Sequence, residues 1–243
     1  MTALGLLYPG HRAEDDYPRI EQLLGSDIRV DLIHTEPGED TRDVAALREL
    51  GSAGRFAEGV EALRLTGAET VVWASAGGGF VHGLAGAQEQ VRTLARLAGM
   101  PASSTSFGFV NAARELGVRR VAVGAAYPRE VTALFADFLR AAGLEVTGPR
   151  SPATATPDEV AGWGREEVLA LARAADTPDA QAVLLPDTAL HTAAHLGVLE
   201  KALSKPVLTA GQVTVWEALR LADRRVNAPT LGSLFTREPL VQV

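Results

Sequence analysis

Short apolar runs alternate with longer amphipathic stretches along the whole chain. The apolar runs are rich in Val and Leu, which is typical of strands buried on both faces of a parallel sheet. They predict strands near residues 3–8, 28–34, 70–75, 102–105, 119–126, 144–148, 181–186 and 206–210. The stretches between them predict helices near residues 14–24, 52–66, 87–98, 108–116, 129–142, 157–174, 192–203 and 212–223. This alternation favours an α/β fold built from βαβ units.

Residues at the helix ends support these boundaries. Thr156 and Pro157 suit the N-cap and the first position of a helix. Several predicted helices are followed by a glycine that can end them in a left-handed conformation, namely Gly25, Gly67, Gly99, Gly117 and Gly143.

The two halves of the chain resemble each other. Three segments recur in the same order at spacings of 105 to 119 residues: 4–9 with 121–128, 70–76 with 182–188, and 100–102 with 205–207. We therefore predict two pseudo-symmetric Rossmann-like (flavodoxin-like) parallel-sheet domains. The first would comprise residues 1–108 plus 212–243 and the second residues 109–211, with the closing helix returning to the first half.

In such sheets ligands bind at the carboxyl ends of the strands, so we expect the site in the cleft between the halves. The residues that follow the strands there become the candidates. Ser75 and Asp187 occupy equivalent positions of the repeat and are expected to face each other. The accompanying candidates are Pro9, Arg12, Ala76, Gly77, Gly78, His82, Tyr127, Thr188 and Ala189.

Composition narrows the classes of function. Hydrophobic residues make up 47% of the 243, enough for a substantial core, whereas the net charge of −7 argues against a nucleic-acid partner. No apolar run approaches the roughly 18 residues of a membrane span, and the N-terminus does not resemble a signal peptide. We expect a cytoplasmic protein. The complete lack of cysteine removes disulfides, thiolate metal sites and cysteine nucleophiles together.

The glycines after Ser75 are the first chemical candidate. Main-chain N–H groups of consecutive glycines can point into one cavity and bind an anion, although a flexible turn is an alternative interpretation. The segment lacks the spacing of both common nucleotide-binding glycine motifs. A strand-end serine such as Ser75 could be a nucleophile or a hydrogen-bond donor, but is more often structural.

Asp187 is the second candidate, since a carboxyl group at the cleft could transfer protons. An aspartate that only starts a turn is the alternative. Tyr127 could donate its hydroxyl to a substrate carboxylate, as could Tyr8, and Arg12 could clamp a carboxylate. Each of these could equally be an ordinary buried tyrosine or surface arginine.

Histidines allow two further interpretations. His191 and His195 stand four apart on the predicted helix, yet no third ligand accompanies them, so no metal is expected. A Ser–His–Asp triad that includes Ser75 would lack its usual G-x-S-x-G motif.

The chain resembles the aspartate/glutamate racemase superfamily, in its maleate isomerase and arylmalonate decarboxylase branch. The resemblance covers nearly the whole length. It rests on the first strand with Pro9, on residues 104–106 and 112–117, and on residues 121–131, 185–192, 199–208 and 216. It implies enolate chemistry next to a carboxylate, without metal or organic cofactor, in which cysteines at two equivalent strand ends serve as acid, base or nucleophile. Those positions map onto Ser75 and Asp187, so both thiols are replaced.

The replacement limits what the resemblance implies. A serine hydroxyl is too weakly acidic to act as a thiolate does, which disfavours thiolate addition and two-base racemisation. The leading hypothesis is a cofactor-independent lyase (decarboxylase-like) or isomerase for a small carboxylate or carbonyl compound, with Asp187 as acid/base and Ser75, Thr188, Tyr127 and the 76–79 main chain holding the oxyanion. The alternatives are a racemase or cis–trans isomerase with another acid/base, and a non-catalytic small-molecule binder. The sequence leaves open whether the chain forms a homo-oligomer, and dimers are the commonest kind.

Overall fold

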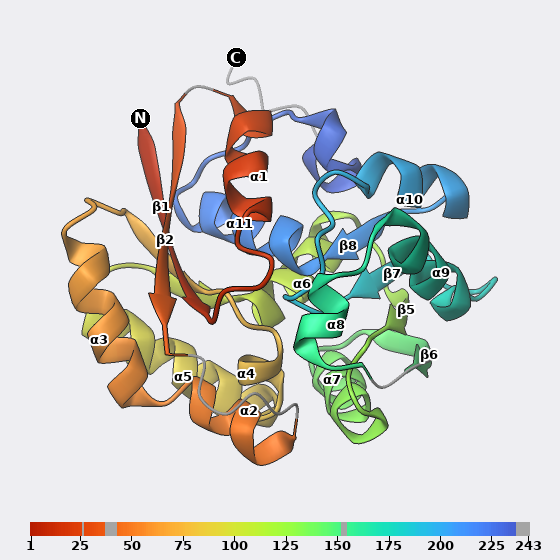
Figure 1. Cartoon of the computed structure of the whole chain (residues 1–243), viewed down its shortest axis with the longest axis horizontal. Helices are drawn as coiled ribbons and strands as arrows, with labels where there is room; N and C mark the ends of the chain where they lie inside the picture. Colours follow the sequence, from red (N-terminus) through yellow and green to blue (C-terminus); the bar gives the residue numbers. More distant parts are fainter. Residues whose placement is uncertain (26, 37–42, 152–154, 237–243) are drawn as a thin grey trace.

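Two four-stranded parallel sheets organise the molecule. The computed structural model describes residues 1–25, 27–36, 43–151 and 155–236. The first sheet has the order β2-β1-β3-β4, with β1 (Thr2–Pro9), β2 (Ile28–Thr35), β3 (Thr70–Trp73) and β4 (Ala102–Ser104). The second has the matching order β6-β5-β7-β8, with β5 (Arg120–Gly124), β6 (Glu145–Arg150), β7 (Ala182–Leu185) and β8 (Val207–Thr209). The matching orders confirm the predicted fold class of two pseudo-symmetric α/β halves (Figure 1).

Helices cover both faces of each sheet (Figure 1). In the first half they are α1 (Asp16–Leu24), α2 (Val44–Leu50), α3 (Ala53–Arg64), α4 (Gly77–Phe80) and α5 (Gly83–Ala98). The remaining α-helices are α6 (Thr105–Glu115), α7 (Arg129–Ala141), α8 (Pro157–Ala161), α9 (Arg165–Ala175), α10 (Leu196–Leu203) and α11 (Ala210–Leu221). Two short 3₁₀ helices, η1 (Pro229–Leu231) and η2 (Ser233–Phe235), follow α11.

The central strands are buried on both faces, as their continuous apolar sequences require. One glycine in each half permits a close approach of neighbouring elements. A Cβ on Gly5 of β1 would lie 2.8 Å from the carbonyl oxygen of Thr70, and a Cβ on Gly124 of β5 would lie 2.8 Å from the Cβ of Ala175. The two glycines occupy equivalent strands, so the repeat extends to the packing of the sheets.

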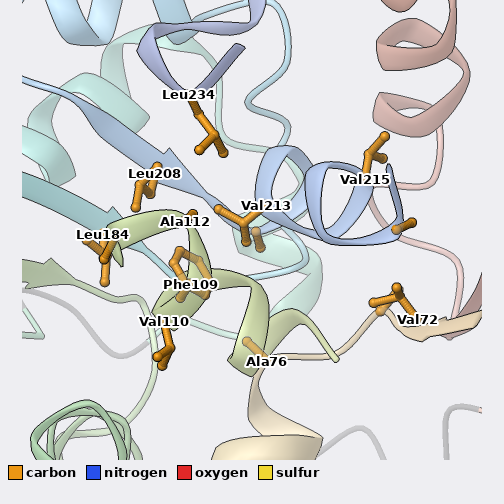
Figure 2. Close-up of a cluster of buried hydrophobic side chains, with 14 of the residues drawn as sticks. Val72, Ala76, Phe109, Val110, Ala112, Leu184, Leu208, Val213, Val215 and Leu234 are labelled. Atoms are coloured by element: carbon orange, nitrogen blue, oxygen red, sulfur yellow. The ribbon is translucent and has the colours of Figure 1, made fainter. Parts of the chain in front are cut away.

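The helices α6 and α11 join the two halves. The helix α11 packs against β1, β3 and β4 of the first sheet, as expected for the closing helix. Figure 2 shows Phe109 and Ala112 of α6 in one buried cluster with Leu184 of β7, Leu208 of β8 and Val213 of α11. This cluster includes residues of both sheets, so the halves share one apolar core.

Several helix boundaries differ from the prediction. The helix predicted over 157–174 is two helices, because Gly164 starts a second one and its N–H donates to the carboxylate of Glu167. The short helices α2 and α4 were not predicted. The helix predicted over 192–203 begins only at Leu196, and the main-chain N–H groups of residues 192 and 193 before it donate to Asp16.

Other local predictions are confirmed. Thr156 caps α8 by accepting a hydrogen bond from the N–H of Glu159, with Pro157 at the first helical position. The five glycines predicted to end helices all have positive φ angles. The assignment of residues to two domains stays a prediction, and its last seven residues lie outside the described ranges. No helix of the described residues is long and apolar enough to cross a membrane.

Candidate functional site

Ser75 and Asp187 are both buried just beyond the ends of equivalent strands, at 3% and 2% relative exposure. Each side chain accepts a hydrogen bond from the turn that follows it. The Oγ of Ser75 accepts from the N–H of Gly78 at 3.1 Å, and the Oδ1 of Asp187 accepts from the N–H of Ala189 at 3.0 Å. The two residues therefore make matching local hydrogen bonds, as strand-end residues that start a turn commonly do.

The glycine segment after Ser75 is a helical turn rather than an open loop. The N–H groups of Gly79 and Phe80 both donate to the carbonyl of Ala76, and that of Gly78 is bonded to Ser75. Within residues 76–79 of the described structure, only the N–H groups of Ala76 and Gly77 donate to no other atom. The main-chain N–H groups of this segment that could bind an anion are thus those of these two residues.

Two tyrosines fix the main chain on either side of Asp187. The hydroxyl of Tyr127 donates to the carbonyl of Pro186 at 3.4 Å, and the hydroxyl of Tyr8 donates to the carbonyl of Thr188 at 3.0 Å. Because Tyr8 belongs to the first half and Thr188 to the second, the second bond also crosses the cleft. Both hydroxyls therefore donate to protein carbonyls, as the interpretation of ordinary buried tyrosines anticipates.

Tyr8 is also electrostatically coupled to the site. Burial raises its pKa to about 12, although the hydrogen bond from the N–H of Ala13 to its hydroxyl opposes the shift. The negative charge of Asp187 adds a smaller rise, as does that of Glu14. Tyr8 thus remains protonated at neutral pH, and Asp187 lies within range of its charge.

The turn of the first half reaches the second half through an aromatic contact. The ring of Phe80, at the end of α4, meets the ring of Tyr127 edge-on, with centroids 5.9 Å apart. The glycine turn, Tyr127 and the segment around Asp187 are therefore connected. That the side chains of Ser75 and Asp187 face each other stays a prediction.

Polar contacts also link the two halves where the chain leaves β1. The Nε of Arg12 donates to the Oδ1 of Asp158 at 2.9 Å, and the Oδ1 of Asp15 lies 2.6 Å from the Nε2 of His191. The Nε of Arg12 is thus engaged by Asp158, and the predicted clamp on a substrate carboxylate stays a prediction.

Asp16 makes the most buried of these contacts. Its Oδ2 accepts hydrogen bonds from the N–H groups of Thr192 at 2.6 Å and Ala193 at 2.9 Å. Burial raises the pKa of this carboxyl above its ordinary value, while the two main-chain donors oppose the shift. Asp16 is not among the predicted site residues, because in the sequence it stands in an acidic run at a helix start and looks like an ordinary first-turn residue. The cross-cleft hydrogen bonds have no local sequence signal.

The remaining predicted residues lie around this centre. Pro9 ends β1 and is partly buried. His82 lies beside Arg48, and both burial and this positive charge lower its pKa, so that it is neutral at pH 7. The Nε2 of His82 is buried without a hydrogen-bond partner among the described residues. The part of His82 in substrate binding stays a prediction.

A cavity of about 510 Å³ adjoins the main chain of Tyr127. Thr132 and Ser151 line it, and both donate their hydroxyls to the carbonyl of Tyr127. Arg129 and Arg150 supply positive charge to the same cavity. This cavity is therefore suited to attract an anion, but its described lining includes none of Ser75, Tyr127 and Asp187.

The histidine pair considered for a metal does not have the predicted geometry. His191 precedes α10, so the two residues are not on one helical turn. Its Nδ1 lies 3.1 Å from the carbonyl oxygen of Ala161, and its Nε2 is engaged by Asp15. A different group of possible metal ligands comprises His11 and Glu14, which follow β1, and His34 on β2.

Comparisons with known proteins agree with the resemblance. A family model for arylmalonate decarboxylase matches residues 51–235. The arylmalonate decarboxylase of Bordetella bronchiseptica is 34% identical over 140 residues, which is 56% of this chain and 58% of that protein. The maleate isomerase of Geobacillus stearothermophilus is 27% identical over 139 residues, 56% of this chain and 55% of that protein. These sequence matches thus span little more than half the length of each relative.

Solved structures match over almost the full length. A liganded double mutant of arylmalonate decarboxylase superposes with a TM-score of 0.82 at 25% identity, covering 97% of this chain and 99% of that one. The maleate isomerase Iso from Pseudomonas putida S16 gives a TM-score of 0.86 at 19% identity, covering 97% of this chain and 98% of that one. The second match supports the fold alone.

Proposed function

Because the chain belongs to the arylmalonate decarboxylase family, we propose that it is a cofactor-independent lyase of the decarboxylase type, or an isomerase, for a small carboxylate or carbonyl compound. The reaction would proceed through an enolate-like intermediate. The observation that carries this proposal is the buried carboxyl group of Asp187 at the end of β7, where the main chain on both sides is fixed by tyrosine hydroxyls.

Asp187 would act as the general acid in a decarboxylation. The bond between the α-carbon and the departing carboxylate breaks, CO2 leaves, and the electron pair remains as an enolate conjugated with the neighbouring carbonyl or carboxylate group. The carboxyl group of Asp187 would take a proton from solvent and transfer it to the α-carbon, which leaves the carboxylate ready for the next cycle. In the isomerase version the same group would remove and return a proton.

Main-chain and hydroxyl donors would stabilise the negative charge of the enolate. The N–H groups of Ala76 and Gly77 donate to no described atom, and neither does that of Thr188. The Oγ of Ser75 accepts from Gly78, which leaves its own hydrogen for a substrate oxygen. Preorganised donors of this kind stabilise developing charge without reorganising during the reaction.

Tyr127 would act as a positioning residue rather than as a direct substrate ligand. Its hydroxyl is bonded to the carbonyl before Asp187, and that of Tyr8 is bonded to the carbonyl after it. The guanidinium of Arg12 would attract the substrate carboxylate at the entrance, while Pro9, His82 and Ala189 would complete the walls.

Two alternatives remain proposals of lower rank. A racemase or cis–trans isomerase would need a second acid/base besides Asp187. A non-catalytic binder is favoured by one observation, namely that the Ser75 and Asp187 side chains already serve their own turns. In neither alternative does the substrate lose CO2 and take up a hydrogen from solvent in its place.

Proton NMR in D2O separates these functions. The purified protein is incubated with malonates, maleate, hydroxy acids and amino acids. Loss of CO2 with deuterium at the α-carbon supports the decarboxylase, and deuterium exchange or isomerisation without CO2 release supports the isomerase. Binding of a compound without any exchange or turnover would contradict the enzyme proposal and favour the binder.

Asp187→Asn tests the acid/base role. Asparagine keeps an oxygen that can accept from Ala189, so the turn should survive, but it cannot deliver the carboxyl proton. We expect turnover to fall by about 10²–10⁴-fold, measured by product formation at equal protein concentration. The control is Asp137→Asn on the exposed face of α7, which should keep full turnover. Unchanged turnover in a correctly folded Asp187→Asn variant would refute the assignment.

A further inference from the structure

Three metal-ligating side chains converge where the chain leaves the first sheet. Within the described parts of the chain, His11, Glu14 and His34 are the group in which one nitrogen or carboxylate oxygen from each lies within 4.8 Å of the others. His11 and Glu14 follow β1, and His34 lies on β2 opposite Tyr8. The parallel pairing of β1 and β2 therefore brings residues distant in sequence to one edge of the sheet.

One carboxylate oxygen in this group lacks a hydrogen-bond donor, although the Glu14 side chain as a whole is 39% exposed. The Oε2 of Glu14 is buried and accepts no hydrogen bond from any residue that the structure describes. The Nδ1 atoms of His11 and His34 lie 3.3 Å and 3.8 Å from it. A buried carboxylate oxygen without a donor is costly, and a cation shared with the two imidazoles would remove that cost.

His34 is oriented as metal-bound histidines usually are. Its Nδ1 lies 2.7 Å from the carbonyl oxygen of Gly10, so the N–H at this position can donate to the carbonyl. That bond leaves the lone pair on Nε2, so an ion would bind His34 through Nε2 and not through the Nδ1 that lies 3.8 Å from Glu14. The carbonyl comes from a residue with a φ of 84°, in the tight turn that directly follows β1.

The His11 ring must turn for both imidazoles to bind one ion. The rings of His11 and His34 are stacked with centroids 4.0 Å apart and planes inclined by 24°, and lone pairs in nearly parallel planes do not converge. The His11 side chain is 64% exposed, so it can rotate without disturbing the core. Two imidazoles and one carboxylate then form the ligand set of three-ligand zinc sites, with a position left open.

We propose that His11, Glu14 and His34 form a binding site for a divalent transition-metal ion of the Zn²⁺ type. Nitrogen ligands favour such an ion over Mg²⁺ or Ca²⁺. The site lies beside Tyr8, whose ring meets that of His34 edge-on with centroids 6.1 Å apart. Its open position would take a water molecule or a carboxylate oxygen. The inference goes beyond the proposed function, whose reaction needs no ion.

Isothermal titration calorimetry with ZnCl2 on chelator-treated protein tests the site. We expect one ion per chain, and an affinity at least about tenfold weaker in His11→Ala and in Glu14→Gln, since even outer-shell changes at metal sites cost that much. Zinc should also raise the melting temperature of the wild type and much less that of His11→Ala. Circular dichroism checks that each variant is folded. We expect His11→Ala to fold normally, because the His11 side chain is exposed.

The matched control is His195→Ala, a histidine outside the group. It should bind zinc as the wild type does. Absence of binding to the wild type, or an equal loss of affinity in His195→Ala, would overturn the proposal. Asp187→Asn should bind zinc normally while losing turnover, so failure of the metal site and failure of the proposed function are distinguishable.

Discussion

The two tyrosines around Asp187 show how single residues define this site. Each donates its hydroxyl to a carbonyl next to the candidate acid, so removing either hydroxyl loosens the segment that carries the carboxyl group. Tyr8 additionally accepts a hydrogen bond from the N–H of Ala13. Its hydroxyl therefore connects two segments of the chain, and its ionisation would break that connection.

Tyr8 predicts a loss of stability at alkaline pH. Its pKa is raised from 10.0 to about 12 in the folded chain, chiefly by burial, so the unfolded chain loses this proton first as the pH rises. The stabilisation is fully present below pH 10.0 and is lost as the pH approaches about 12. We expect the free energy of unfolding to fall across this range by about 3 kcal/mol more in the wild type than in Tyr8→Phe.

Urea unfolding at a series of pH values measures this difference. At neutral pH, Tyr8→Phe should be less stable by about 1–3 kcal/mol, because the Thr188 carbonyl and the Ala13 N–H lose their partner. The tyrosinate absorbance of the folded wild type supplies an independent check. Ionisation of Tyr8 in the native state near its ordinary pKa would show that burial does not act as described.

At the scale of elements, the segment after β1 is bonded to the segment after β7. Asp16, at the start of α1, accepts from the N–H groups of Thr192 and Ala193, which precede α10. Its neighbour Asp15 makes an exposed ion pair with His191. The two adjacent aspartates therefore offer a direct comparison between a buried and an exposed contact.

Asp16→Ala should lower the stability of the chain by about 2 kcal/mol or more, because it leaves two buried N–H groups without an acceptor. Asp16→Asn should lose less, since its amide oxygen can still accept. Asp15→Ala should change the free energy of unfolding by less than about 1 kcal/mol, as exposed ion pairs usually do. Chemical denaturation of the four proteins measures the order. Equal losses in Asp15→Ala and Asp16→Ala would contradict it.

The repeat and the apolar pattern were sufficient to predict the sheets. Buried strands such as β1 and β7 are apolar throughout, and glycines such as Gly99 mark helix ends by their positive φ, so local physics determines both. The second helix of the 157–174 stretch was missed because its start depends on Gly164 and Glu167, which resemble an ordinary helical continuation.

The site was less predictable because its contacts are long-range. The equivalence of Ser75 and Asp187 follows from the repeat, and the structure gives both a matching turn. The bond from Tyr8 to Thr188 joins residues 180 positions apart, and the Asp16 bonds span similar separations. No periodicity encodes such pairs. The number of N–H groups in the glycine turn that remain able to bind a substrate depends on the helical conformation of the turn. The glycines alone do not specify that conformation.

At the scale of the whole molecule, two helices bind the halves into one core. The closing helix α11 packs on the first sheet, and Phe109 of α6 lies in a buried cluster that includes strand residues of both sheets. Separate apolar clusters lie on the outer sides, one containing Trp73 in the first half and one packed against Trp163 in the second. A cleft between halves that share a core is expected to be stiff.

This arrangement predicts that the two halves unfold together. Of the three tryptophans, Trp73 and Trp163 report on different halves, so variants that keep only one of them resolve the two transitions by fluorescence. Phe109→Ala should destabilise the chain by about 3–5 kcal/mol and shift both transitions equally, because the cavity opens in the shared core. Leu65→Ala, at an exposed position, should shift neither. If Phe109→Ala moved the Trp163 transition alone, the halves would be separate folding units, and the shared core would not hold the cleft.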